Sequence, residues 1–158
     1  TMDKQDVGPA LGKIVSGIYI LTAKHASNET GMLASWVQQA GFDPPAITVA
    51  IKKGRYVVDW INDGVPFVVN VLSDENKQML AHFGKGFPEG DPAFESLLIR
   101  RSSQGIALLS SALAHIECQV ISQLESSDHH IFLAEVVSGA LQNEGAPMTH
   151  VRKDGFHY

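Results

Sequence analysis

The sequence predicts a mainly β domain, folded as an antiparallel barrel or sandwich with a few short helices between its strands. Apolar residues alternate with polar or mixed ones in three separate segments, as they do in strands that bury one face. The alternating apolar positions are Ile47, Val49 and Ile51, then Phe67, Val69 and Val71, then Ala114, Ile116, Cys118 and Val120. Helical patterns are few and do not alternate regularly with strands, which disfavours a doubly wound parallel sheet. A closed antiparallel sheet would also hide its edges.

The first part of the chain predicts one helix and two strands. Residues 1–8 are expected to be a tail, left over from cloning or from an excised domain, and residues 9–158 a single domain, because no repeat or linker interrupts them. Pro9 begins a helical apolar pattern, since proline favours the first turn of a helix. Ile18–Thr22 predicts a strand, and the polar segment Ala23–Gly31 predicts a loop to the next strand.

The remaining segments complete the sheet. Ala46–Lys52 is a strand, and the run that follows Ile131 continues as another strand in which Gly139 is tolerable as a bend or bulge. Three connections carry helical patterns instead. They are Tyr56–Asp63, Glu75–Phe83 and Pro92–Leu98.

The composition excludes several classes of function. Of the 158 residues 44% are hydrophobic and only 18% charged, so the chain can bury a core and is not disordered. With 12 Lys and Arg against 17 Asp and Glu, the net charge of -5 offers no general attraction for nucleic acid. No apolar run is long enough to span a membrane as a helix. The single Cys118 cannot close an internal disulfide, which favours the cytoplasm.

Motifs for several kinds of catalysis are absent. The sequence contains no GxGxxG after a strand, no GxxxxGK[ST], no HExxH, no CxxC and no GxSxG. Nucleoside-triphosphate, zinc-protease and serine-hydrolase mechanisms therefore have no support. The seven histidines lack the paired spacing of common metal sites, so no metal ligands are predicted.

The segment Gly31–Pro45, GMLASWVQQAGFDPP, is the most unusual stretch. At Ala34 and Ser35, small side chains leave the backbone accessible to a flat ligand. Trp36 and Phe42 could wall such a ligand, and the proline pair fixes the turn. The alternative is an edge strand whose aromatic side chains fill the core.

A cluster of cations, Lys52-Lys53-Gly54-Arg55, ends the Ala46–Lys52 strand of this acidic chain. The helix predicted from Tyr56 begins directly after it, with its N-terminus facing back. Cations beside a helix N-terminus attract anions, and a phosphomonoester would suit such a site. A solvated turn is the alternative.

Two further positions are candidates for ligand contacts. Asn70 shares a face with apolar residues of its strand, and a buried amide needs partners, either in a neighbouring loop or on a ligand. His129 and His130 are adjacent on a strand and point to opposite faces, so at most one of them faces a given site. Asp128 could orient one of the rings or end the preceding turn.

Taken together and in order, five segments resemble the flavin reductase-like family. They are GMLASW (Gly31–Trp36), FDPP (Phe42–Pro45), FVVNVL (Phe67–Leu72), SDH (Ser127–His129) and DGFHY (Asp154–Tyr158). The resemblance spans nearly the whole chain and is closest to the C-terminal flavin reductase module of cyanobacterial flavodiiron proteins. It implies an FMN-binding split β-barrel, antiparallel and of the Greek-key type, and a longer parent chain with a flavodiiron core.

The resemblance also implies a flavin site and a reaction. The residues implied to bind FMN are Met32, Leu33, Ala34, Ser35, Trp36, Phe42, Lys52, Lys53, Arg55, Asn70 and Leu72, and the residue implied to be catalytic is His129. Met32–Trp36 would line the flavin and the three cations would neutralise its phosphate. Asn70 and the backbone of Leu72 would meet the ribityl or pyrimidine side, and His129 would stand where the nicotinamide docks. Hydride transfer from NADH or NADPH needs proximity and no side-chain nucleophile.

Two departures from the family pattern keep an alternative open. The family has glycine where this chain has Ser127, and a glycine near the following Glu-Val where this chain has Ala134. Both replacements are small, but they bear on access for the nicotinamide. The alternative is a non-catalytic module that holds FMN as an electron relay, or that serves to dock or dimerise. A sugar- or lipid-binding sandwich would leave the cation cluster and Asn70 unexplained. A homodimer is implied by the family and fits the low charged fraction.

Overall fold

The computed structural model describes all residues 1–158 and confirms the mainly β fold. Seven antiparallel strands form one sheet in the order β3-β2-β6-β9-β10-β5-β4. Their bounds are β2 (Tyr19–His25), β3 (Asn28–Ala34), β4 (Val37–Phe42), β5 (Pro45–Lys52), β6 (Phe67–Val71), β9 (Ala114–Glu125) and β10 (His129–Leu141). Two small ribbons join β1 (Ser16–Gly17) to β11 (Thr149–His150) and β7 (Ile99–Arg101) to β8 (Ala107–Leu109). The helices are α1 (Lys4–Gly12), α2 (Tyr56–Asn62) and α3 (Lys77–Phe83).

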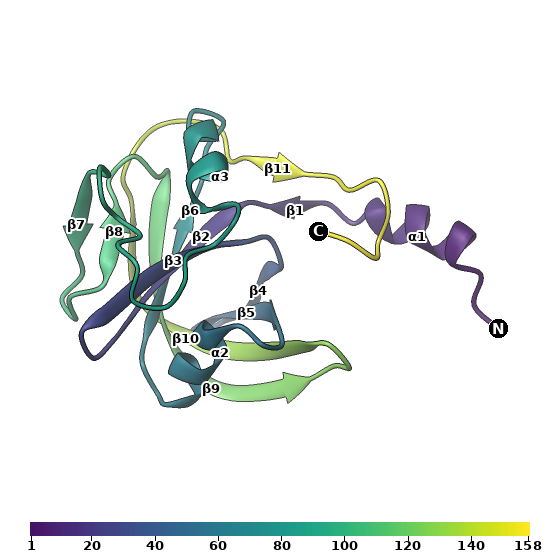
Figure 1. Cartoon of the computed structure of the whole chain (residues 1–158), viewed down its shortest axis with the longest axis horizontal. Coiled ribbons are helices and arrows are strands. Elements are labelled where there is room, and N and C mark those ends of the chain that lie inside the picture. The colour runs from purple at the N-terminus through teal and green to yellow at the C-terminus, as the bar shows by residue number, and fades with distance from the viewer.

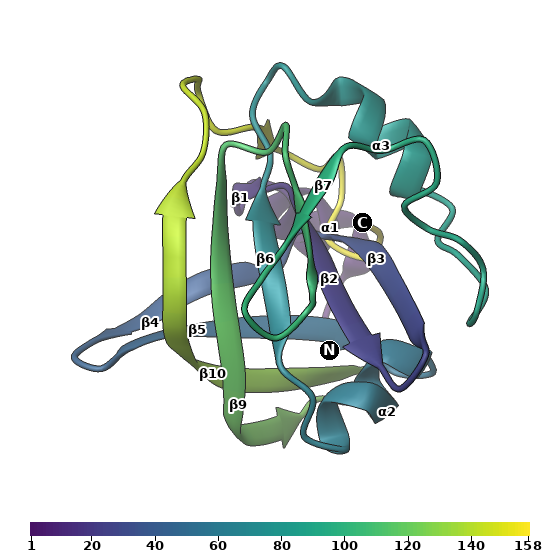
Figure 2. The ribbon, with the colours of Figure 1, turned by 90° about the vertical axis from the view of Figure 1, so that its left-hand side faces the viewer.

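The two longest strands join the halves of a split barrel. The first part of β9, Ala114–Cys118, pairs with β6, whereas the first part of β10, His129–Glu135, pairs with β5. The strands also pair with each other, with register shifts after Leu133 and after Val136. Such irregularities bend a strand and increase its twist. Figure 2 shows β9 and β10 bending so that β4 and β5 cross the direction of β6.

Two hydrophobic cores lie on opposite faces of β2. Leu21 and Phe67 belong to the core inside the barrel, which α2 closes with Trp60. Ile20 belongs to a second core between the sheet and α3, which supplies Phe83. Because successive side chains of a strand point to opposite faces, β2 is buried on both sides.

The predicted alternation is confirmed in β5 and less complete in β6 and β9. Ile47, Val49 and Ile51 are buried on one face of β5, as expected. In β6, Val68 and Asn70 of the reverse face are fully buried as well. In β9, His115 and Glu117 of the reverse face are each only 9% exposed. The reverse face of β6 is covered because Ile106 and Leu108, at the β7–β8 ribbon, pack on Val68.

The N-terminal helix begins earlier than predicted. Residues 1–8 are not an extended tail, because α1 starts at Lys4 and Pro9 lies inside it. The side chain of Asp3 caps the helix by accepting a hydrogen bond of 2.9 Å from the backbone N–H of Gln5. Figure 1 shows α1 beyond β1 and β11, outside the barrel. There it contacts the C-terminal segment, where the N–H of Gly155 donates to the carbonyl of Gly8 at 2.7 Å.

Other predicted elements are confirmed or corrected. The helices predicted at Tyr56–Asp63 and Glu75–Phe83 are present as α2 and α3, but Pro92–Leu98 forms turns and no helix. The loop predicted over Ala23–Gly31 is a two-residue turn, in which Ala26 has a positive φ of 56°. Gly139 lies where a Cβ atom would come 2.8 Å from the carbonyl oxygen of His115. No helix of the structure is both long and apolar enough to cross a membrane.

Candidate functional site

A groove of about 330 Å³ opens between β3, the end of β5 and α3. We call it the main groove. It brings together six of the residues predicted to bind a cofactor: Met32, Leu33, Ala34, Ser35, Lys52 and Arg55. Leu80 and Phe83 of α3 add apolar surface, and Tyr158 lies at its border. The groove therefore combines apolar walls with two cations.

Small residues shape the β3 side of the main groove. A Cβ atom on Gly31 would lie 2.7 Å from the ring of Phe83, so the glycine allows α3 to pack closely against β3. β3 ends at Ala34, and Ser35 lies outside the strand pairing, between β3 and β4. The hydroxyl of Ser35 makes no hydrogen bond within the protein. It is a free polar group on an otherwise apolar wall, as a ligand site requires.

The cation cluster divides between the groove and the surface. Lys53 points away from the groove, and its Nζ lies 3.7 Å from Oε2 of Glu125, so its predicted role at a phosphate is not supported. Lys52 and Arg55 line the groove and form no ion pair with any carboxylate. Arg55 precedes α2 without capping it through its side chain. Two uncompensated cations in a chain of net charge -5 favour an anionic ligand.

His129 lies in an adjacent cavity of about 310 Å³, which shares Lys52 and Tyr158 with the main groove. His129 is 7% exposed, and its ring packs on Trp36 with a centroid separation of 4.6 Å. Its Nδ1 lies 2.8 Å from Oδ1 of Asp128, and its Nε2 contacts the hydroxyl of Tyr158. His129 and His130 point to opposite faces as predicted, because Nδ1 of His130 lies 3.2 Å from Oε1 of Glu125 instead.

Two pKa shifts accompany this arrangement. The hydrogen bond from His129 lowers the pKa of Asp128, so the carboxylate stays charged. Burial raises the pKa of Tyr158, so its hydroxyl stays protonated and can donate to His129. Asp128 thus orients the ring of His129, which is one of the two roles predicted for it.

Phe42 and Leu72 also lie outside the main groove, and Trp36 has a different position from the one expected. Phe42 is 91% exposed near the tip of the β4–β5 hairpin, so it forms no wall of the main groove. Trp36 does not wall the main groove but packs on His129 next to it. The backbone N–H of Leu72 donates to Ile18 and its carbonyl accepts from Met148, so both groups are already used.

Asn70 is a structural residue. Its side chain is fully buried, and its Nδ2 donates to the carbonyl of Ile20 at 2.9 Å and to Oγ1 of Thr22 at 3.1 Å. Its Oδ1 accepts from the N–H of Leu109 at 3.0 Å. These bonds within the protein account for the burial of the amide, so the structure favours the alternative of a partner in a neighbouring loop over the predicted contact with a ligand.

Several residues of the site carry no local signal in the sequence. Tyr158 and Arg152 reach the site from the C-terminal segment, and the guanidinium of Arg152 lies 5.4 Å from the ring of Trp36. The DGFHY segment contains Tyr158 and contributes to the family resemblance, but nothing in it indicates contact with His129.

The chain offers neither a reactive thiol nor a cluster of metal ligands. Burial raises the pKa of the Cys118 thiol to about 12, so it offers no thiolate at neutral pH. No group of three His, Cys, Asp or Glu side chains is placed to hold a metal ion.

Comparison with known proteins identifies the class. A family model described as "Flavin reductase like domain" matches residues 11–157. The chain therefore belongs to the flavin reductase-like family, and its fold is the split barrel of flavin reductases. This membership assigns the domain to the oxidoreductases that act on flavins.

Sequence relatives indicate the kind of longer protein in which similar domains occur. The chain is 41% identical over 155 residues to "Diflavin flavoprotein A 1" of Synechocystis sp. and 39% identical over 155 residues to "Putative diflavin flavoprotein A 1" of Thermosynechococcus vestitus. Each alignment covers 97% of this chain but only 27% of the relative, so the chain spans about a quarter of these proteins.

Solved structures support the fold. Nitrilotriacetate monooxygenase component B from Mycobacterium thermoresistibile has a TM-score of 0.82 at 25% identity, over 92% of this chain and 80% of that one. The flavin reductase PheA2 has a TM-score of 0.81 at 24% identity, over 95% of this chain and 94% of that one.

Proposed function

We propose that this chain binds FMN in the main groove and reduces it with NADH or NADPH, as one domain of a longer electron-transfer protein. The observation that carries the proposal is the pair of uncompensated cations, Lys52 and Arg55, at an apolar groove beside the free hydroxyl of Ser35. A phosphorylated, flat, aromatic cofactor matches this donor set. The apolar side chains of β3 and α3 would contact the ring system, and the cations would hold the phosphate.

The residues of the chain would act by binding, orienting and excluding water. When bound, the flavin supplies at N5 the acceptor for a hydride from C4 of the nicotinamide, so that the nicotinamide is oxidised and the flavin is reduced. His129 would guide the nicotinamide, because Asp128 and Trp36 hold its ring in one orientation. Tyr158 occupies Nε2 of His129 and would have to move before that atom contacts a second ligand.

The experiment separates binding from reduction. FMN is titrated into the purified chain, and the complex is then mixed anaerobically with NADH or NADPH while the visible flavin absorbance is followed. Saturable binding followed by bleaching is expected. A bound flavin that stays oxidised in an excess of both nicotinamides would contradict the reductase proposal while leaving the flavin site intact.

A relay or dimerisation module is the second candidate, and apolar surface around β4 favours a docking role. Two open cavities of about 690 and 550 Å³ flank β4 and share Tyr19, Val37 and Gln38. Phe42 and Leu141 are among the exposed hydrophobic side chains of this region. A second copy of the chain would cover such surface, giving the homodimer that we propose. Light scattering tests the dimer, and turnover of free FMN in the absence of a partner domain separates the reductase from the relay.

The proposal also concerns the longer protein of which this domain would be a part. Since the diflavin relatives are nearly four times as long as the matched region, we propose that this domain passes electrons to a flavodiiron core in the same chain and in the cytoplasm. Reduction of such a core by NADH, with and without this domain attached, tests that role.

A further inference from the structure

The C-terminal segment covers His129 from outside the barrel. The cavity of about 310 Å³ that holds His129 is lined on one side by strands of the barrel and on the other by residues 152–158. Tyr158 lines both this cavity and the main groove, and its hydroxyl contacts Nε2 of His129. The ring of Tyr158 also packs on Trp36, with a centroid separation of 5.1 Å. A ligand that is to contact Nε2 of His129 must therefore displace part of the chain itself.

The C-terminal segment is joined to α1. The backbone N–H of Arg152 donates to the carbonyl of Gly12 at 3.2 Å, and its guanidinium donates to the carbonyl of Leu11 at 3.3 Å. A Cβ atom on Gly155 would overlap the side chain of Leu11, so the glycine allows the segment to lie directly against the helix. α1 and residues 151–158 thus form one unit, which we call the flap.

Few bonds connect the flap to the barrel. The hydrogen bonds that leave α1 all end at residues 152 and 155, and none reaches the seven-stranded sheet. Within residues 151–158, only Tyr158 forms a hydrogen bond with that sheet, at His129. The chain enters and leaves the flap through the ribbon of β1 and β11, which has only two residue pairs. Figure 1 shows the chain running from β11 out to α1 and then turning back toward the barrel.

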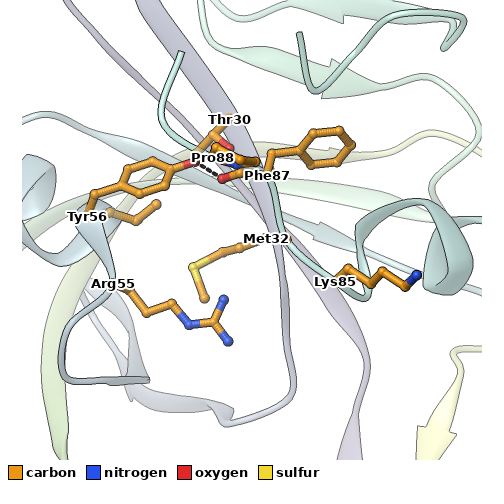
Figure 3. Close-up of a pocket in the computed structure, with 10 residues that line it drawn as sticks. Thr30, Met32, Arg55, Tyr56, Lys85, Phe87 and Pro88 are labelled. Atoms are coloured by element: carbon orange, nitrogen blue, oxygen red, sulfur yellow. Dashed lines mark hydrogen bonds between the residues drawn. The ribbon is translucent and has the colours of Figure 1, made fainter. Parts of the chain in front are cut away.

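The opposite boundary of the main groove is held more firmly. Beyond Arg55, the loop of residues 84–90 is tied to both α2 and β3. The hydroxyl of Tyr56 donates to the carbonyl of Phe87 at 2.7 Å and lies 2.8 Å from Oγ1 of Thr30. Figure 3 shows both contacts. Because segments with few hydrogen bonds to the rest of the fold open most readily, the flap and not this loop is the boundary suited to move.

We propose that the flap is an autoinhibitory cover, which holds Tyr158 on His129 in the free chain and must move away before the nicotinamide can enter. The inference rests on the proposed function, since that function places the nicotinamide beside His129. Because only the open form would bind the nicotinamide, the apparent affinity is reduced by the fraction of chains that are open. Substitutions that loosen the flap should therefore strengthen nicotinamide binding.

Two variants loosen the flap, and a third is their control. Arg152→Gln removes the guanidinium that lies 5.4 Å from the ring of Trp36 and its hydrogen bond to Leu11. Tyr158→Phe keeps the ring but loses the hydroxyl contact with His129. Lys153→Gln removes the same charge at the next position, where the side chain is exposed and forms no ion pair. Circular dichroism checks the fold of all three.

The first measurement needs no flavin. Diethyl pyrocarbonate modifies accessible histidines of the complete chain, and mass spectrometry of its peptides gives the rate at each one. In the unmodified chain His129 should react far more slowly than His157, whose side chain is 83% exposed. The rate at His129 should rise about tenfold in Arg152→Gln and about fivefold in Tyr158→Phe, and stay unchanged in Lys153→Gln. Equal rates at His129 and His157 in the unmodified chain, or no rise in either loosened variant, would overturn the inference.

The second measurement tests entry of the nicotinamide. The flavin-loaded chain is reduced anaerobically at a series of NADH or NADPH concentrations. The half-saturating concentration should fall about tenfold in Arg152→Gln and stay unchanged in Lys153→Gln. An unchanged value in Arg152→Gln would show that the flap does not control entry, and a higher value would make Arg152 a binding residue for the nicotinamide cofactor. Either result would overturn the inference. A bound flavin that neither nicotinamide reduces would instead refute the proposed function, and the modification rates would still decide whether the flap covers His129.

Discussion

Asp128 holds the imidazole of His129 through a contact of 2.8 Å between Oδ1 and Nδ1. A carboxylate can only accept, so Nδ1 of His129 carries a proton, while Nε2 on the other side of the ring contacts the hydroxyl of Tyr158. The ring of His129 is thereby held in one orientation from two sides, although Asp128 itself is exposed.

Replacing Asp128 by asparagine should slow flavin reduction without removing the flavin. The amide oxygen of Asp128→Asn still accepts from Nδ1, but the charge that favours this orientation is lost. We expect the anaerobic reduction rate to fall about tenfold and the flavin dissociation constant to change by less than about threefold. Glu125→Gln is the matched control, because Glu125 contacts His130 and Lys53 and not His129. An unchanged rate in Asp128→Asn would show that the orientation of His129 does not limit the reaction.

The same pair has a defined pH dependence. The pKa of Asp128 is lowered in the folded chain, so the contribution of its carboxylate to stability is fully present above the ordinary aspartate pKa of about 3.9. That contribution is lost as the pH falls through the lowered value. The difference in unfolding free energy between the unmodified chain and Asp128→Asn should therefore be constant from neutral to mildly acidic pH and shrink only in stronger acid. Urea unfolding at a series of pH values measures it.

Removing the two groove cations should weaken FMN through its phosphate. We expect the double variant Lys52→Ala with Arg55→Ala to raise the dissociation constant of FMN more than about tenfold. Lys53→Ala should have little effect, because Lys53 already faces Glu125 at the surface. Riboflavin, which lacks the phosphate, should bind the double variant and the unmodified chain alike. Equal losses for riboflavin and FMN would place the effect on the ring and not on the phosphate.

Asn70→Ala should destabilise the fold and leave the flavin site of the folded fraction unchanged. The substitution removes three hydrogen bonds and leaves the N–H of Leu109 without its partner in a fully buried environment. An unsatisfied buried group costs about 1–3 kcal/mol, in addition to the cavity left behind. Urea unfolding measures the loss, and titration with FMN under native conditions tests the site. A selective loss of FMN affinity at full stability would instead return Asn70 to the ligand.

Asn70 also shows which contacts could not be predicted from the sequence. Its burial follows from the apolar residues around it, but its partner Leu109 lies 39 positions away on a ribbon that no local pattern predicts. The strand β5 was predictable because it buries one face and leaves the other only partly covered, whereas β2 is covered on both faces and shows no alternation.

Candidate site residues were predictable to the extent that they are neighbours in sequence. Met32–Ser35 and the cations Lys52 and Arg55 lie close together because β3 and β5 end on the same side of the barrel. Phe42 belongs to the same segment as Ser35, but the β4–β5 hairpin carries it away into solvent. Tyr158 meets His129 from the C-terminal segment, which is hydrogen-bonded to α1, and such contacts leave no trace in the local sequence.

Tyr56→Phe should loosen the loop of residues 84–90, which follows α3. The variant keeps the ring but loses the hydrogen bond of 2.7 Å to the carbonyl of Phe87 and the contact with Thr30. One buried hydrogen bond contributes about 0.5–1.5 kcal/mol, so the global stability should fall by a similar amount. Hydrogen exchange of residues 84–90 should become faster while that of the barrel strands is unchanged, because the loop opens locally. Tyr19→Phe is the control, since the hydroxyl of Tyr19 makes no hydrogen bond and the residue lines the cavities that flank β4. Unchanged exchange in residues 84–90 of Tyr56→Phe would mean that the packing of Phe87 on Phe83, with ring centroids 5.8 Å apart, holds the loop without the hydroxyl.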